Sequence, residues 1–164
     1  MPVPLIIYSS TDGHTKIICQ KIINSLNDKD AATLVSLDEV TKFDLSTFDK
    51  IIIGASIRYG KHDKQLYKFI NANKNLLNQK YSIFFSVNAV ARKQKKNSPE
   101  TNPYIKKFLK ISSWKPKKIG VFAGKVDYPN YNFFDKYIIK FIMFITGGPT
   151  DTSKSYEFTD WSKV

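Results

Sequence analysis

The sequence predicts an α/β fold of the doubly wound class, in which helices cover both faces of a parallel sheet. Five short apolar runs alternate with segments that carry apolar residues at helical spacing, and this rhythm indicates right-handed crossover units. The third run, KIIIGA, is continuously apolar, as strands buried on both faces of a parallel sheet are. A chain of 164 residues with 42% hydrophobic content suffices for a single domain, residues 1–164.

The expected strands are the apolar runs themselves, at Pro4–Tyr8, Thr33–Leu37, Lys50–Ala55, Tyr81–Val87 and Lys118–Ala123. The expected helices have apolar residues three and four positions apart. They cover Thr15–Leu26, His62–Leu77 and Pro99 to about Ser112. Pro99 is placed at the start of its helix because proline is favoured in the first helical turn.

After the fifth strand the alternation ends in an insert of about residues 127–154, whose centre predicts a helix over Phe133–Ile145. This helix has an unusually wide apolar surface. One stripe is Phe134, Tyr137, Phe141 and Phe144, the next is Ile138, Ile142 and Ile145, and the polar edge is Lys136 and Lys140. Two interpretations stay open: an ordinary core helix, or a helix with one half packed on the domain and the other half against a membrane surface or a hydrophobic ligand.

The formal net charge is +12, and only two of the 26 basic residues are arginine, Arg58 and Arg92. Such a surface favours anionic partners, although a lysine-rich codon bias explains the same composition. A nucleic-acid partner is disfavoured because the lysines are spread along the chain. The single cysteine, Cys19, excludes an internal disulfide, and with only His14 and His62 as histidines no metal site is expected. Neither a secretory signal nor a membrane-spanning run is expected.

The first strand is followed by a turn, SSTDGHT, that is rich in hydroxyl residues. It has two interpretations: Ser10 or Asp12 caps the next helix, or the helix N-terminus holds a phosphate with its free N–H groups. Three hydroxyl residues and Gly13 directly after a buried strand favour the phosphate. The turn lacks both the Walker ending and GxGxxG spacing, which disfavours a nucleotide hydrolase and a Rossmann dehydrogenase.

Two more loops follow the third and fourth strands, at the sheet edge where doubly wound folds bind ligands. In GASIRYG, small residues leave room for a flat ligand on which Tyr59 stacks, and Arg58 is placed to meet an acid; a simple turn is the alternative. In SVNAVARK, Asn88 and the backbone of Ala89 and Val90 are candidates to hydrogen-bond a heterocycle, and a solvated basic loop is the alternative.

The first turn resembles the FMN-phosphate turn of flavodoxins, T-x-T-G-x-T, with Ser10, Gly13 and Thr15 at matching positions. Asp12 departs from that pattern, and we expect it to cap the helix or to point away. The resemblance implies a flavodoxin-like strand order 2-1-3-4-5 and FMN as cofactor. The FMN-binding residues expected from the three loops are Ser9, Ser10, Thr11, Asp12, Gly13, His14, Thr15, Ala55, Ser56, Ile57, Arg58, Tyr59, Gly60, Ser86, Val87, Asn88, Ala89, Val90 and Ala91.

Roughly residues 5–161 resemble the bacterial quinone-dependent protoporphyrinogen IX dehydrogenases. The segments that carry this resemblance are YSSTDGHT, IIGASIRYGKH, SVNAVARK, TNPYIKKFL, SWKP, DKYIIKFIMFITGG and TDTSKSYEFTDW. The resemblance implies an FMN enzyme of heme biosynthesis that oxidises protoporphyrinogen IX and passes electrons to menaquinone or ubiquinone. Because arginine forks suit carboxylates, Arg58 and Arg92, together with Lys93, are the expected ligands of the substrate; no catalytic residue is assigned.

The same resemblance implies a peripheral location on the cytoplasmic face of the inner membrane, with an anionic membrane surface as partner; assembly into a homo-oligomer stays open. The family continues with a final helix after TDW, so we expect that helix to be truncated here. A flavodoxin-type electron carrier and a flavin-dependent quinone reductase are the alternative functions. The basic charge, the two arginine loops and the aromatic insert argue against the carrier.

Overall fold

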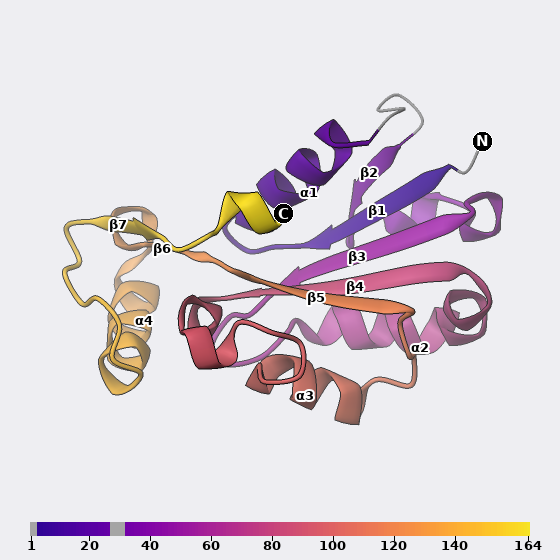
Figure 1. The fold of residues 1–164 in the computed structure, drawn as a ribbon. Helices are drawn as coiled ribbons and strands as arrows, with labels where there is room; N and C mark the ends of the chain where they lie inside the picture. The colour runs from indigo at the N-terminus through magenta and orange to yellow at the C-terminus, as the bar shows by residue number, and fades with distance from the viewer. Residues whose placement is uncertain (1–2, 27–31) are drawn as a thin grey trace.

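The computed structural model describes residues 3–26 and 32–164. Five parallel strands form one sheet in the order β2-β1-β3-β4-β5 (Figure 1). They are β1 (Pro4–Ser9), β2 (Thr33–Ser36), β3 (Lys50–Ser56), β4 (Tyr81–Asn88) and β5 (Lys118–Ala123). The predicted fold class and strand order are therefore confirmed, with strand bounds within one residue of those expected.

Helices cover the two faces of the sheet unequally (Figure 1). One face is covered by α2 (Lys64–Gln79) and α3 (Pro103–Ile111), and the other by α1 (His14–Asn24). The larger core lies under α2 and α3, where the rings of Phe84 and Phe108 stack with centroids 3.9 Å apart and Trp114 is fully buried. On the α1 face, Trp161 and Val164 at the C-terminal end of the chain add to the core.

The predicted start of the third helix at Pro99 is wrong. The helix α3 begins at Pro103, because the side chain of Asn102 accepts hydrogen bonds from the backbone N–H groups of Tyr104 and Ile105 and so caps it. Proline does stand in the first turn of this helix, as the rule predicts, but that proline is Pro103 and not Pro99. Residues 98–101 form a separate turn before the cap.

The insert lies beyond the carboxyl ends of the strands (Figure 1). It is bracketed by a two-stranded antiparallel sheet of β6 (Lys125–Asp127) and β7 (Ser155–Glu157), which the sequence analysis did not predict. Its helix, α4 (Phe133–Ile145), has the predicted bounds, but only Met143 of its residues is buried. The interpretation of α4 as an ordinary core helix is therefore wrong. In the described part of the chain, no helix is both long and apolar enough to cross a membrane.

His62 precedes α2 and is buried beneath the carboxyl end of β4. Its Nε2 lies 2.9 Å from the hydroxyl oxygen of Ser86, which also accepts a hydrogen bond from the side-chain amide of Asn88. The Ser86 hydroxyl is thus free to donate to a neutral imidazole. Burial, with a smaller effect from Lys107, lowers the pKa of His62 to about 4.

This lowered pKa predicts an acid-sensitive fold. The unfolded chain protonates a histidine near pH 6.5, whereas the folded protein keeps His62 neutral down to about pH 4. The free energy of unfolding should therefore fall as the pH drops from 6.5 towards 4, by about 3 kcal/mol in all. Urea unfolding of the wild type and of His62→Gln, at several pH values in this window, measures the effect. An equal pH slope in both proteins would contradict the prediction.

Candidate functional site

A single cavity forms where the three predicted loops meet at the carboxyl end of the sheet. Most of the predicted FMN-binding residues line it, namely Ser10, Thr11, Asp12, His14, Thr15, Ser56, Ile57, Arg58, Tyr59, Gly60, Val87, Asn88, Ala89 and Val90; the substrate candidate Arg92 lines it as well. The predicted residues that do not line it are Ser9, Gly13, Ala55, Ser86, Ala91 and Lys93. Strand register explains three of these, because Ser9, Ala55 and Ser86 lie side by side in one row of the sheet, and the next row, Ser56 and Val87, lines the cavity instead.

The insert forms the remaining wall of the cavity, which the sequence analysis did not assign. The inner side of α4 contributes the residues Ile139, Ile142, Met143 and Thr146, and the segment after β5 contributes Gly124 to Asp127 together with Tyr131. The predicted isoleucine stripe did not identify this wall: only Ile142 of the stripe lines the cavity, whereas Ile138 and Ile145 are exposed. The cavity is therefore polar at the three loops and apolar beneath α4.

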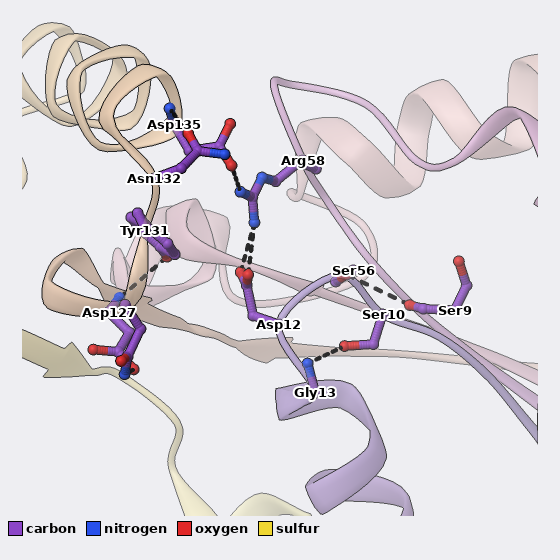
Figure 2. A network of polar contacts seen from close by, with 11 residues as sticks. Ser9, Ser10, Asp12, Gly13, Ser56, Arg58, Asp127, Tyr131, Asn132 and Asp135 are labelled. Atoms are coloured by element: carbon purple, nitrogen blue, oxygen red, sulfur yellow. Dashed lines mark hydrogen bonds and ion pairs between the residues drawn. The ribbon is translucent and has the colours of Figure 1, made fainter.

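The turn after β1 fits a phosphate. Gly13 is the N-cap of α1 and has a left-handed φ of 86°, and no side chain caps the first N–H groups of the helix. The capping interpretation is thus wrong for this helix: Ser10 accepts only from the N–H of Gly13, and Asp12 points elsewhere (Figure 2). Among the described residues, the hydroxyl oxygen of Thr15 is the one buried side-chain polar atom without a hydrogen-bond partner. An oxygen-rich ligand satisfies both the free N–H groups and this hydroxyl.

Arg58 lies between the phosphate turn and α4 (Figure 2). Its Nη1 is 2.8 Å from both carboxylate oxygens of Asp12, and its Nη2 is 2.6 Å from a carboxylate oxygen of Asp135 in the first turn of α4. The guanidinium also lies over the rings of Tyr59 and Tyr131. Burial opposes the charged form, but the bonds to Asp12 and Asp135 outweigh it and raise the pKa of Arg58. Arg58 is consequently engaged within the protein, and of the two expectations for Asp12, capping is wrong and the side chain turns to Arg58 instead.

The loop after β4 is shaped by two buried asparagines. The side chain of Asn88 accepts from the N–H of Ala91 and exchanges hydrogen bonds with Asn102, which also donates to the carbonyl of Lys96. Asn88 is 2% exposed, so its side chain fixes the loop and leaves the backbone of Ala89 and Val90 to meet a ligand. The expected contact of Asn88 with the heterocycle stays a prediction, and Asn88 lines the cavity.

Arg92 differs from Arg58 in having no acidic partner among the described residues. Its Nη1 donates to the carbonyl of Ala89 at 2.7 Å, and its Nη2 lies 3.2 Å from the carbonyl of Thr146, the C-cap of α4. Burial lowers the pKa of Arg92, although the side chain retains its charge. A half-buried cation that faces only neutral oxygens is well placed to accept an anionic ligand.

Comparison with known proteins identifies the class. The flavodoxin domain family matches residues 5–153, so the chain is a flavodoxin-type protein. The chain is 44% identical over 99% of its length to a protoporphyrinogen IX dehydrogenase (quinone) from Leishmania major, of which it covers 71%. It is 38% identical over 98% of its length to the protein of the same name from Escherichia coli K12, of which it covers 89%. The chain belongs to this family of oxidoreductases.

Solved structures agree with this fold. A flavoprotein in complex with FMN from Lactobacillus acidophilus NCFM superposes with a TM-score of 0.52 at 17% identity, over 74% of this chain and 93% of that chain. Trp repressor binding protein from Bacillus subtilis gives a TM-score of 0.51 at 16% identity, over 74% and 84% of the two chains. At such identities the likeness supports the fold alone.

The unpartnered hydroxyl of Thr15 gives a specific prediction. Thr15→Val removes this oxygen but keeps the shape of the side chain, so the stability of the flavin-free protein should stay the same or rise slightly. FMN affinity should fall about tenfold or more, since a hydrogen bond to a charged group contributes about 1.5–3 kcal/mol. Thermal unfolding and FMN fluorescence titration measure the two effects. A large loss of stability with unchanged FMN affinity would show that Thr15 serves the fold instead.

Proposed function

We propose that this protein oxidises protoporphyrinogen IX to protoporphyrin IX in heme biosynthesis, with electrons passing through FMN to menaquinone or ubiquinone. The identity of 38–44% over nearly the whole chain to relatives named for this reaction carries the proposal. The cavity supports it independently, because a flavodoxin-type electron carrier has no need of an apolar wall beside its flavin loops.

The cavity residues divide the work of binding. Thr15 and the free N–H groups at the start of α1 are suited to the FMN phosphate, and the backbone of Ala89 and Val90 to the edge of the ring. When bound, FMN supplies the electron-pair acceptor for the oxidation. The protein holds the substrate against it and excludes water, and the apolar inner side of α4 is suited to a flat, greasy macrocycle.

Arg92 is the residue we assign to a substrate carboxylate. It lines the cavity, is half-buried and faces only carbonyl oxygens and a hydroxyl. Arg58, the other candidate, already binds two carboxylates, so a propionate would have to displace one of them. The structure therefore supports Arg92, rather than Arg58, as the arginine that pairs with the substrate.

The outer face of α4 is suited to an anionic membrane surface. Phe134, Phe141 and Phe144 are 63–75% exposed there, and Lys136 and Lys140 lie on the same helix. Exposed aromatic residues beside lysines are typical of helices that lie in the interfacial region of a bilayer. We infer that α4 places the cavity at the membrane, where a quinone is available.

The main test is an anaerobic assay of the FMN-loaded protein with protoporphyrinogen IX and a quinone. Porphyrin fluorescence should appear at a rate that depends on both enzyme and quinone. A folded, FMN-loaded protein that forms no porphyrin above the uncatalysed rate would overturn the proposal. If the same protein reduces the quinone with a nicotinamide cofactor as donor, it is a quinone reductase.

The assignment of Arg92 predicts a defect confined to the substrate. Arg92→Lys keeps the charge but loses the planar fork, so KM for protoporphyrinogen IX should rise about tenfold, with kcat and FMN occupancy within about twofold of the wild type. Steady-state kinetics and the flavin absorbance of the purified protein measure these quantities. Loss of flavin from the variant would make Arg92 a cofactor residue.

The membrane assignment predicts binding to phosphatidylglycerol vesicles and weak binding to phosphatidylcholine vesicles. Replacement of Phe134, Phe141 and Phe144 by serine should reduce binding more than tenfold, since each aromatic ring contributes on the order of 1 kcal/mol or more when buried in the interface. Phe43→Ser, at a surface position that is 39% exposed and remote in sequence from α4, is the matched control. Equal vesicle sedimentation of the triple variant and the wild type would contradict the assignment.

A further inference from the structure

Asp12 occupies an unfavourable place for a carboxylate. It lies in the turn between β1 and α1, among residues that line the flavin cavity, and next to Gly13, where the free N–H groups of α1 begin. A phosphate monoester bound in this turn carries negative charge. A carboxylate within a few ångströms repels it and lowers the affinity of the turn for the phosphate. Something must offset this repulsion for the turn to hold FMN.

Arg58 is the group that offsets it. Both oxygens of Asp12 accept from Nη1 of Arg58 at 2.8 Å, and this bidentate contact is the only ion pair of Asp12 among the described residues. The Arg58 side chain is 17% exposed and that of Asp12 is 41% exposed, so water screens the pair mainly from the Asp12 side. Figure 2 shows the Asp12 carboxylate turned from the helix N-terminus towards the guanidinium.

The same guanidinium fixes the insert. Its Nη2 binds Asp135 at 2.6 Å, and Asp135 is in the first turn of α4, whose inner side closes the cavity. The ring of Tyr59 packs beneath Arg58, and Tyr59 is the only described residue other than glycine with a positive φ, 53°. The chain turns at Tyr59, and backbone hydrogen bonds between Arg58 and Lys61 close this turn.

We propose that the Asp12–Arg58 pair sets the preference of this site for FMN over riboflavin. When Arg58 is paired with Asp12, it neutralises the carboxylate charge, and the turn can bind a phosphate. Unpaired, Asp12 repels the phosphate while leaving the ring site intact. Asp12 therefore lowers the affinity for the phosphate. Its carboxylate also binds Arg58, the arginine that contacts Asp135 in α4. This inference rests on FMN as the cofactor and not on the oxidation of any substrate.

The test compares FMN with riboflavin, which lacks the phosphate, by fluorescence titration of the flavin-free protein. The ratio of the two dissociation constants measures the phosphate preference. Arg58→Gln should weaken FMN binding about tenfold or more and riboflavin binding less than about threefold, since only FMN meets the unpaired Asp12. Asp12→Asn/Arg58→Gln should recover most of that loss, and Asp12→Asn alone should raise the preference above the wild type.

Two controls keep the result interpretable. Arg92→Gln removes the other arginine of the cavity and should change the phosphate preference less than Arg58→Gln does. Asp12→Asn retains a side-chain oxygen to accept from Arg58 and leaves Asp135 in place, so it provides a second variant if Arg58→Gln is unstable. An equal loss of FMN and riboflavin affinity in Arg58→Gln, or no gain in preference in Asp12→Asn, would overturn the proposal. Either result would leave the proposed oxidation untouched, because no turnover is measured.

Discussion

The guanidinium of Arg58 holds together parts of the chain that are far apart in sequence. Asp12 comes from the turn after β1, Arg58 from the loop after β3, and Asp135 from the insert after β5, and their three contacts are all 2.8 Å or shorter. Without this bridge, both carboxylates would lose their cation, and Asp12 lines the cavity that must accept a phosphate. The polar phosphate turn and the apolar wall of α4 therefore enclose one site because a single cation lies between them.

Rigidity on the opposite side of the cavity comes from neutral groups. Asn102 caps α3 and at the same time orients Asn88, whose side chain holds the loop that carries Ala89 and Val90. Ser86 connects this pair to the buried His62. Each of these polar atoms is satisfied by another within the protein, so the loop is preorganised before a ligand binds. The loop expected to bind the flavin ring is thus held by uncharged hydrogen bonds, whereas the turn expected to bind the phosphate is held by ion pairs.

The fold was predictable because periodicity and strand composition are local properties. The five strands and α4 have nearly the predicted bounds, and the three loops lie together because the carboxyl ends of parallel strands share an edge. Long-range features were not predictable. The pairing of β6 with β7, and the pairing of Arg58 with Asp12 and Asp135 rather than with a substrate, depend on how the insert folds back. The start of α3 was missed because two prolines fit the same local rule, and only the cap at Asn102 distinguishes them.

The two arginines also explain why a lysine-rich chain retains arginine at these positions. Arg58 makes bonds in two directions, to Asp12 and to Asp135, and Arg92 does the same between Ala89 and Thr146. A guanidinium holds its N–H donors in fixed directions and can therefore bind two partners at once. A lysine ammonium is a point charge on a flexible stem and lacks this geometry. Arg58 thereby joins the β3 loop to the first turn of α4, and Arg92 joins the β4 loop to its last turn. The insert helix is fastened at both ends to the loops that form the flavin site, which leaves its outer aromatic face unpaired and its inner face fixed above the cavity.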